Sequence, residues 1–411
     1  MQLNNVKDFY VISSISKILL IDLGANLDLC KNMRLSVKLI FQWAALGLFI
    51  SWVALYFRYN SGTTAKSYSL PQPPSLTGPL APNELLTKTR KILEGEVVGP
   101  ESIVVVEKSI YATLYDGRII KIENDKIVKT ITLTKEKNCG NWNSEPRCGR
   151  PLGIRQIRDE RFLVADAYKG IHEVDFSTGK HKQLVSPLSA AIPQLMFVND
   201  LDVINEDEFV FTDSSSKYDR RHFMNTVLEG VPDGRVFHHK ISSGKTTLLV
   251  DNLYFANGIQ LIDGRKSFVV SECSMARIRK YTFATKKLET FAENLPGLPD
   301  NIRAAEDGTL WVGMAGIRSD QHRSMVDKLA DMPTIRQFII DTVPANVMLQ
   351  LFPYFKPPHS LVLQLSSNGK ILRSLHDPAG KVIEDSSQVT PHGNSLYFGS
   401  FHSSFIGILD L

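Results

Sequence analysis

The chain has 411 residues, of which 43% are hydrophobic and 22% are charged, and this is the composition of an ordinary globular protein. The formal net charge is only +4, and no dense block of Lys and Arg occurs, which argues against a nucleic-acid partner. Other partners must therefore be inferred from individual segments and sites.

The first distinctive feature along the chain is an uncharged apolar run at residues 39–57, LIFQWAALGLFISWVALYF. A run of about 20 apolar residues is long enough to cross a hydrocarbon core of roughly 30 Å as a helix. Lys31, Arg34 and Lys38 precede the run closely, whereas Arg58 follows it. By the positive-inside tendency, the N-terminus is expected to stay in the cytosol.

We therefore predict a single-pass type II membrane protein of the plasma membrane or endoplasmic reticulum. Residues 1–38 would be a cytosolic tail and residues 39–57 a transmembrane signal anchor, with the remainder luminal or extracellular. A cleaved signal peptide has a shorter apolar region and a small-residue cleavage site, which this run lacks. A buried core helix is the other alternative, and we favour a membrane span because apolar residues surround every face of the run.

The next segment, residues 58–84, is rich in proline, with serine, glycine and threonine between the prolines. Its five prolines are Pro71, Pro73, Pro74, Pro79 and Pro82. This composition predicts an extended, semi-rigid stalk that holds a domain off the bilayer.

Two cysteines, Cys139 and Cys148, enclose a short polar loop, CGNWNSEPRC. In an oxidising compartment they are expected to form a disulfide. A metal site is the alternative, but the loop offers few further ligands. Cys273 remains without a partner and is expected to be a small buried hydrophobe.

The rest of the chain, residues 85–411, repeats one pattern of two alternating strands separated by a turn. The six instances are 110–122, 162–176, 209–213 with 234–240, 268–282, 310–316 with 361–366, and 396–411. Alternation with a period of two, broken by Gly, Asp and Asn, is typical of strands and turns. The fold class predicted is all-β, a six-bladed β-propeller, since a β-sandwich has no reason to repeat the same strand pair six times.

One segment departs from this pattern, because residues 324–355 carry apolar residues at near-helical spacing between prolines. We predict two short helices inserted in the fifth blade. They could form a lid over a central site or a patch that touches the membrane surface, or pack on the propeller with no further role.

Polar residues placed once per blade, just before an innermost strand, are the candidates for a site on the propeller axis. They are Glu101, Asn199 with Asp200, Asn257, and Asp300 with Asn301. A single Asn or Asp of this kind is most often a turn residue, but the repetition at one blade position favours a shared site. All the donors are carboxylate or amide oxygens, which suit calcium rather than zinc or copper.

The motifs GPES, FVND, FANGIQL and LPDNIRAAEDGTLWVGM resemble those of the calcium-dependent six-bladed propellers, the group of paraoxonase, gluconolactonase and strictosidine synthase. CGRPLGIR at 148–155 and SLHDPAG at 374–380 are similar to the strictosidine synthase-like branch. The resemblance extends from about residue 35 to the C-terminus. It implies five calcium ligands, namely Glu101, Asn199, Asn257, Asp300 and Asn301. Ser102 occupies the place of a carboxylate that binds a second calcium in paraoxonase, which argues against a second ion.

The catalytic groups of these families match less well. The two paraoxonase histidines correspond to Leu152 and to a position near Asp166, and the strictosidine synthase glutamate corresponds to Ser387. Glu384 and Asp385 are close to that last position but out of register. Condensation of an amine with an aldehyde is therefore not expected.

The function predicted from the sequence is that of a membrane-anchored, calcium-dependent esterase-like hydrolase of the arylesterase or lactonase type. Calcium would polarise the carbonyl of a small ester or lactone, and Asp300 is the candidate general base. His172 and His402 are expected to be surface or loop residues. The alternative is a non-catalytic propeller in which calcium is structural and the surface binds a partner or a lipid.

Overall fold

The structure is a computed structural model that describes the chain from residue 31 to residue 411, without the side chains of residues 31–38, 54 and 56–61. Most of the predicted tail, residues 1–30, lies outside the described residues. The chain divides into two compact units, residues 1–62 and residues 63–411. Each unit is considered by itself below.

The first unit contains one long helix, α2 (Lys31–Ser61), which includes the predicted anchor at residues 39–57. The side chains of residues 39–52 are all exposed, among them Trp43 (67%), Leu48 (73%) and Trp52 (62%). In the part of the chain that the structure describes, no helix meets the length and hydropathy expected of a membrane span. The predicted transmembrane anchor is thus not confirmed.

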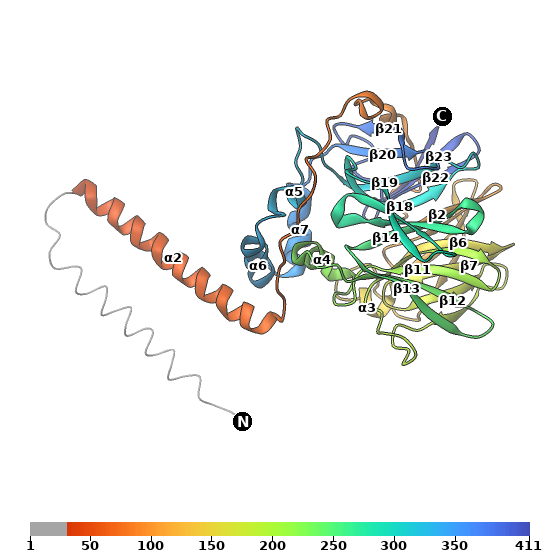
Figure 1. Ribbon diagram of the computed structural model, residues 1–411, viewed down its shortest axis with the longest axis horizontal. Coiled ribbons are helices and arrows are strands. Elements are labelled where there is room, and N and C mark those ends of the chain that lie inside the picture. The colour runs from red at the N-terminus through yellow and green to blue at the C-terminus, as the bar shows by residue number, and fades with distance from the viewer. Residues whose placement is uncertain (1–30) are drawn as a thin grey trace. The chain divides into compact units, whose positions relative to one another are not determined.

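The second unit is a ring of six antiparallel sheets of four strands each, which confirms the predicted six-bladed propeller (Figure 1). The first three blades follow one another along the chain. The first blade comprises β2 (Ile103–Val106), β3 (Ser109–Thr113), β4 (Arg118–Glu123) and β5 (Lys126–Thr132). The second comprises β6 (Pro151–Arg158), β7 (Arg161–Asp166), β8 (Gly170–Asp175) and β9 (Lys180–Val185). The third comprises β10 (Val198–Asn205), β11 (Glu208–Asp213), β12 (Gly234–Lys240) and β13 (Lys245–Leu253).

The remaining blades close the ring. The fourth blade comprises β14 (Ala256–Ile262), β15 (Ser267–Glu272), β16 (Arg277–Thr282) and β17 (Lys287–Ala292). The fifth comprises β18 (Gly297–Ala304), β19 (Leu310–Ile317), β20 (Ser360–Leu365) and β21 (Ile371–Asp377). The sixth comprises β22 (Gln388–His392), β23 (Ser395–Gly399), β24 (Ile406–Asp410) and β1 (Arg90–Ile92). Because β1 pairs with β24, the two ends of the propeller share one blade and the ring has no open join.

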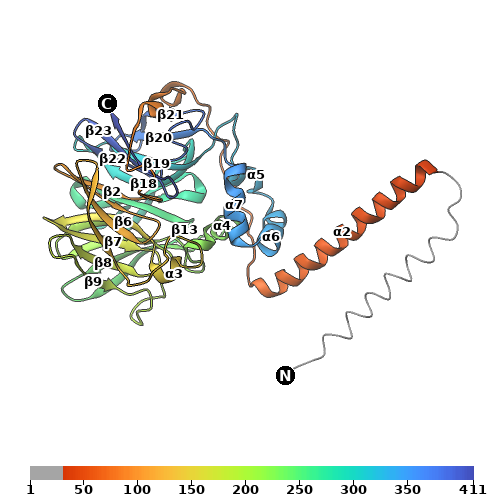
Figure 2. The same ribbon diagram turned by 180° about the vertical axis from the view of Figure 1, so that it is seen from behind.

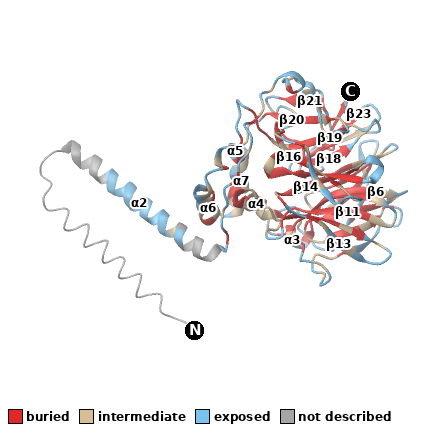
Figure 3. Ribbon diagram, in the orientation of Figure 1, coloured by how far each residue is buried: buried red, intermediate tan, exposed pale blue. Residues whose placement is uncertain are grey.

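The hydrophobic core lies between neighbouring blades, where the buried strands are seen in red in Figure 3. Between the first two blades, the ring of Tyr111 packs on Phe162 and Phe176 with centroids 4.3 and 5.0 Å apart. The outermost strands are only half buried. In β5, for example, only Ile131 is buried and alternate residues are exposed, which explains the period of two in the sequence.

Four helices gather at one end of the propeller, as both views show (Figures 1 and 2). We call these helices the cap: α4 (Phe223–Glu229), α5 (Met325–Leu329), α6 (Pro333–Thr342) and α7 (Ala345–Phe355). The last three lie in the fifth blade between β19 and β20, where the sequence predicted two helices. There are three because Pro333 begins α6 and Pro344 precedes α7, so that each proline starts a new helix.

The segment predicted as a stalk is extended, but from Thr63 onward it belongs to the compact propeller unit. The backbone N–H of Ala65 donates to Gln337 Oε1 at 2.8 Å, and that of Tyr68 donates to the carbonyl of Ala330 at 3.2 Å. Farther along, the carbonyl of Pro71 accepts a hydrogen bond from Arg318 Nη2 at 2.8 Å. The cap thus supplies acceptors for two backbone N–H groups of this segment, and Arg318 supplies a donor for one of its carbonyls.

Candidate functional site

The five predicted calcium ligands lie at the same end of four innermost strands. Glu101 is just before β2, Asn199 is the second residue of β10, Asn257 is the second residue of β14, and Asp300 and Asn301 lie within β18. All five side chains are buried. Glu101, Asn199, Asn257 and Asp300 line one cavity, so the structure brings these four together. Asn301 is buried beside them but is not part of the cavity lining.

An irregularity in strand pairing occurs at the ligand positions of three of these strands. The register shifts between Val198 and Leu201 in β10, and between Ala256 and Ile259 in β14. In β18 it shifts between Pro299 and Ile302. A bulge of this kind releases residues from the regular ladder and re-aims their side chains. The ligand residues lie within these bulges.

Side-chain oxygens of four of the five residues are buried without a hydrogen-bond partner. They are Oδ1 of Asn199, Asn257, Asp300 and Asn301. Because most buried polar atoms in proteins are paired, a group of unpaired acceptors marks a place that a water molecule or a cation can fill. The described residues include no group of three or more His, Cys, Asp and Glu side chains able to hold a metal. A site here therefore depends on amide oxygens, which calcium accepts, and the residues fit that ion.

The two carboxylates of the set have different surroundings. Glu101 Oε2 accepts a hydrogen bond from Arg150 Nη2 at 2.7 Å. Burial raises the pKa of Glu101, and Arg150 opposes that shift. Burial also raises the pKa of Asp300 well above its ordinary value, and the nearby charges of Glu101 and Asp385 act in the same direction. A cation among these oxygens would offset both effects.

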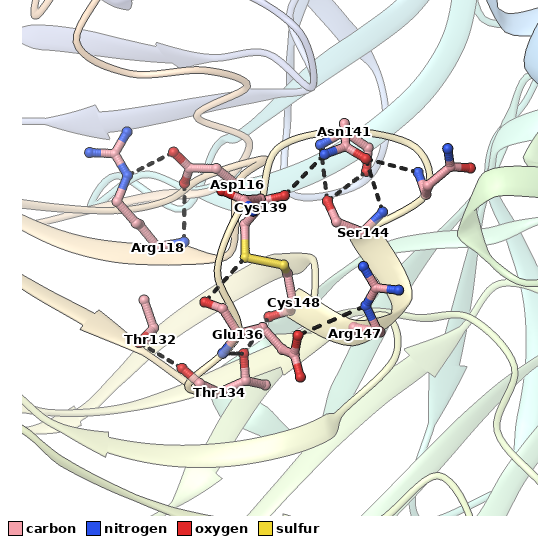
Figure 4. The surroundings of a disulfide bond; sticks show 12 residues. Asp116, Arg118, Thr132, Thr134, Glu136, Cys139, Asn141, Ser144, Arg147 and Cys148 are labelled. Carbon is pink, nitrogen blue, oxygen red and sulfur yellow. Dashed lines mark hydrogen bonds and ion pairs between the residues drawn. A yellow bond between two sulfur atoms is a disulfide. The ribbon is translucent and has the colours of Figure 1, made fainter.

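The predicted disulfide between Cys139 and Cys148 is present, with Cα atoms 5.7 Å apart (Figure 4). Cys148 ends the short helix α3 (Glu145–Cys148), and Gly149 follows with a φ of 88°. A Cβ at Gly149 would lie 2.5 Å from Asp166 Oδ2, so only glycine fits this turn. The disulfide and the turn together fix the backbone that leads into Arg150, the partner of Glu101.

A buried arginine side chain, that of Arg303, lies next to Ser102. Arg303 from β18 donates to Asp200 Oδ2 at 2.8 Å and to Ser102 Oγ at 3.0 Å, and it also contacts Gln388. Asp200, predicted as a possible member of the site, thus lies in this arginine network. Its Oδ2 also accepts the backbone N–H of Ile259 at 3.1 Å, which ties the third, fourth and fifth blades together.

Above the ligand oxygens lies a cavity of about 340 Å³ between the propeller and the cap. Its walls are apolar. The propeller contributes Leu152, Phe197, Phe255, Cys273 and Leu298, and the cap contributes Phe223, Val227, Val326, Ile339, Met348, Leu351, Phe352 and Phe355. Leu152, which replaces a paraoxonase histidine, is therefore part of this apolar wall. Cys273 is buried as predicted, and burial raises the pKa of its thiol.

The other residues considered from the sequence lie away from the cavity lining. Asp166 Oδ1 accepts the backbone N–H groups of Tyr168 and Lys169, both at 2.9 Å. The expectation that His172 is a surface or loop residue is wrong, because His172 is buried within β8. His402 does lie in an exposed loop, with Nδ1 3.2 Å from Asp385 Oδ2.

Three cavity-lining cations, Arg220, Arg336 and Lys356, were not predicted from the sequence. Lys356 follows α7 and its Nζ pairs with Asp385 Oδ2 at 2.6 Å. Arg220 precedes α4 and its Nη1 pairs with Glu145 Oε2 at 3.1 Å. The sequence feature that could have pointed to Arg220 is the long interval between the second and third strands of the third blade, because an interval of that length has room for an inserted helix. The partner of Lys356 is Asp385, which lies 29 residues farther along the chain, so no local sequence pattern shows the pair.

Comparison with known proteins gives the chain a family. Family models described as "Strictosidine synthase" and "Strictosidine synthase-like, N-terminal" match residues 199–286 and 78–122. The adipocyte plasma membrane-associated protein of Salmo salar is 39% identical over 369 residues, covering 89% of this chain and 88% of that protein. The chain belongs to the strictosidine synthase-like family of adipocyte plasma membrane-associated proteins. A plant relative, strictosidine synthase-like 3 of Arabidopsis thaliana, is 34% identical and covers 84% of this chain and 91% of its own length.

Solved structures of low sequence identity share the fold. A gluconolactonase of Xanthomonas campestris superposes with a TM-score of 0.52 at 16% identity, covering 85% of this chain and 98% of that one. Regucalcin of Agrobacterium tumefaciens, described as a calcium-binding protein, also has a TM-score of 0.52, at 11% identity, covering 78% and 92%. At these identities the likeness establishes the propeller architecture alone.

Proposed function

We propose that this protein is a membrane-anchored, calcium-dependent hydrolase of esters or lactones. The observation that carries the proposal is the group of four unpaired, buried oxygens, three of which belong to residues that line the floor of an apolar cavity. A largely apolar pocket with a few convergent polar groups is the usual form of a small-molecule site. The names of the structural neighbours, a gluconolactonase and a calcium-binding regucalcin, support the same chemistry.

The residues of the site have separate parts in this proposal. Glu101, Asn199, Asn257, Asp300 and Asn301 would hold the ion through their side-chain oxygens. When bound, calcium supplies a positive charge that polarises a carbonyl and stabilises the oxyanion formed when water attacks it. The apolar walls exclude bulk water and bind the carbon skeleton of the substrate.

Asp300 is our candidate general base for the attacking water. Its Oδ1 has no hydrogen-bond partner, and Asp300 lines the cavity in which a substrate would lie. A carboxylate in this position can accept a proton from a water molecule within hydrogen-bonding distance. Activity of the strictosidine synthase type is not proposed, since Ser387 stands where that reaction needs a carboxylate.

We further propose that helix α2 anchors the chain as a single-pass, type II membrane protein with the propeller in the lumen or outside the cell. Three observations support this. The run at 39–57 is uncharged, the described large apolar side chains of α2 are exposed, and the relatives carry the name plasma membrane-associated. The disulfide also fits an oxidising compartment.

A second candidate is a non-catalytic propeller that binds an apolar ligand or a protein partner and uses calcium for stability. One observation favours it. Among the described residues that line the cavity there is no histidine, and Leu152 stands where paraoxonase has one.

Hydrolysis of phenyl acetate and a simple lactone by the full chain in detergent micelles distinguishes the two candidates. The hydrolase proposal predicts turnover with calcium, loss of turnover with a chelator, and loss with Asp300→Asn. Asp307→Asn is a matched control, because Asp307 is an exposed turn residue in the same blade. Calcium binding without turnover of either substrate would contradict the hydrolase proposal and favour the binding protein.

A further inference from the structure

The side of α6 and α7 that faces away from the propeller is mostly apolar and carries no charge. We call it the outer face of the cap. Its exposed large apolar side chains are Met332 (42%), Ile335 (47%), Phe338 (39%), Leu351 (42%), Tyr354 (84%) and Phe355 (59%). The exposed polar residues of the two helices, Thr334, Asn346 and Gln350, are uncharged. From Pro333 to Phe355 the only charged residues are Arg336 and Asp341, and both are buried (1% and 5% exposed). No charge from this stretch therefore reaches the surface.

The exposed residues share a face because of their spacing. Ile335 and Phe338 are three positions apart on α6, and Leu351, Tyr354 and Phe355 are three or four apart on α7. Single exposed apolar residues are common on soluble proteins, but a contiguous group of them marks an interaction site. The group here includes two large aromatic side chains, Phe338 and Phe355, and a tyrosine.

We propose that the outer face of the cap lies in the interfacial layer of a lipid membrane, as a contact separate from helix α2. The proposal rests on the membrane anchoring put forward above. A lipid surface suits this face because the interfacial layer of a membrane accepts apolar side chains and needs no charged residues to pair with. The edge of a protein interface, by contrast, is usually polar. Arg323, just before α5, and Lys328, within it, are both exposed and could reach lipid headgroups, although Asp331 is exposed there as well.

Chain connectivity supports a lipid rather than another occupant. Helix α2 ends at Ser61, and two residues later Thr63 belongs to the propeller unit, where its Oγ1 lies 2.9 Å from Tyr218 Oη. Thr64 then reaches Glu229 of α4, and Ala65 reaches Gln337 of α6. Whatever the placement of α2, two residues of extended chain span at most about 7 Å. A membrane entered by α2 would therefore be tethered close to the cap.

The contact would also give the cavity an entrance from the lipid. Leu351 and Phe355 are exposed on the outer face, and both also line the cavity. A substrate dissolved in the membrane could pass between them into the cavity without crossing water. The substrate class that follows is an amphiphilic ester or lactone with its carbonyl end toward Asp300.

The test places a fluorescent nitrobenzoxadiazole label on single cysteines of the full chain in phosphatidylcholine vesicles. Phe338→Cys and Tyr354→Cys report on the outer face. Ser243→Cys is the control, since Ser243 is exposed in the turn between β12 and β13. Strand direction places that turn at the end of the propeller opposite the cap. The background carries Cys30→Ser and Cys273→Ala.

Interfacial helices lie about 5–10 Å into the headgroup and acyl boundary, so lipids spin-labelled near the headgroup should quench the cap labels at least about twofold and leave the control unchanged. Equal quenching at all three positions, or none, would overturn the proposal. A label shielded from water yet not quenched by lipid would show that protein covers the face, which also overturns it. Flotation of the same vesicles tests the anchor separately, and no substrate is present, so the outcome does not depend on hydrolysis.

Discussion

Arg150 donates a hydrogen bond from Nη2 to Oε2 of Glu101 at 2.7 Å, and both side chains are almost completely buried (0% and 7% exposed). The same guanidinium also donates to the carbonyls of Gly99 and Phe401. The arginine therefore joins the start of the second blade to the first and sixth blades and orients one carboxylate of the candidate calcium site. Loss of the arginine should affect both stability and calcium binding.

Replacement of Arg150 by methionine should lower the free energy of unfolding by about 3–5 kcal/mol, because Glu101 would remain buried without its partner. The measurement is chemical denaturation of the protein in calcium-free buffer. Arg158→Met is the control. Arg158 pairs with Glu206 on the surface at 2.6 Å, where both side chains are about half exposed (47% and 63%), and its loss should cost less than about 1 kcal/mol. Equal effects of the two variants would contradict this role of Arg150.

Calcium should stabilise the folded protein, because the unfolded chain does not assemble the five ligands. At a concentration 100 times the dissociation constant, the expected gain in unfolding free energy is about 2.7 kcal/mol. Asp300→Asn removes one of two ligand charges and should weaken binding at least about tenfold, reducing the gain to about 1.4 kcal/mol. Thermal unfolding with and without calcium measures this. An unchanged gain in Asp300→Asn would exclude Asp300 as a ligand, and Asp307→Asn should behave as the wild type.

Gly258 follows the predicted ligand Asn257 at a point where two innermost strands approach closely. A Cβ at this position would lie 2.5 Å from both the Cα of Asn301 and the carbonyl oxygen of Asp300. Gly258→Ala should push β14 away from β18, lower stability by about 1–3 kcal/mol and weaken calcium binding. Gly316→Ala is the comparison, because a Cβ at Gly316 would meet no other atom within 4 Å. Calorimetric titration that finds normal calcium affinity in Gly258→Ala would contradict the close approach.

A pair of buried histidines in the fifth blade should make the fold sensitive to acid. His359 Nε2 lies 2.7 Å from His376 Nδ1, and Ser374 Oγ lies 2.6 Å from His376 Nε2. Burial lowers the pKa of His376 to about 4, and His359 adds to that shift. Below pH 6.5 the unfolded chain would bind a proton that the folded chain does not, so stability should fall between about pH 6.5 and 4 by up to about 1.4 kcal/mol per pH unit.

Thermal unfolding as a function of pH tests this prediction. In His376→Gln the dependence between about pH 6.5 and 4 should be shallower than in the wild type. His392→Gln, at a partly exposed position, should retain the wild-type slope. A wild-type slope in His376→Gln would show that other groups cause the acid sensitivity.

The propeller was predictable from the sequence because each blade repeats a strand pair with a period of two and turn residues between the strands. The pairing of β1 with β24 was not, since Arg90–Ile92 is too short to show alternation and its partner strand lies at the other end of the chain. The gathering of Asn257 and Asp300 at one cavity was predictable because they recur at one blade position, and calcium binding by them stays a prediction. The packing of residues 63–84 on the cap and the fifth blade was missed, because proline-rich composition indicates an extended chain but not its neighbours.

The rate of phenyl acetate hydrolysis as a function of free calcium decides whether the bound ion serves catalysis. A calcium-dependent hydrolase should show no turnover in chelator and a rate that saturates with the same midpoint as the calcium-induced stabilisation of the fold. In Asp300→Asn the saturated rate should fall, whereas in Asp307→Asn both curves should coincide with those of the wild type. Turnover that persists in chelator, or a fold that calcium stabilises without any hydrolysis, would contradict a calcium-dependent hydrolase.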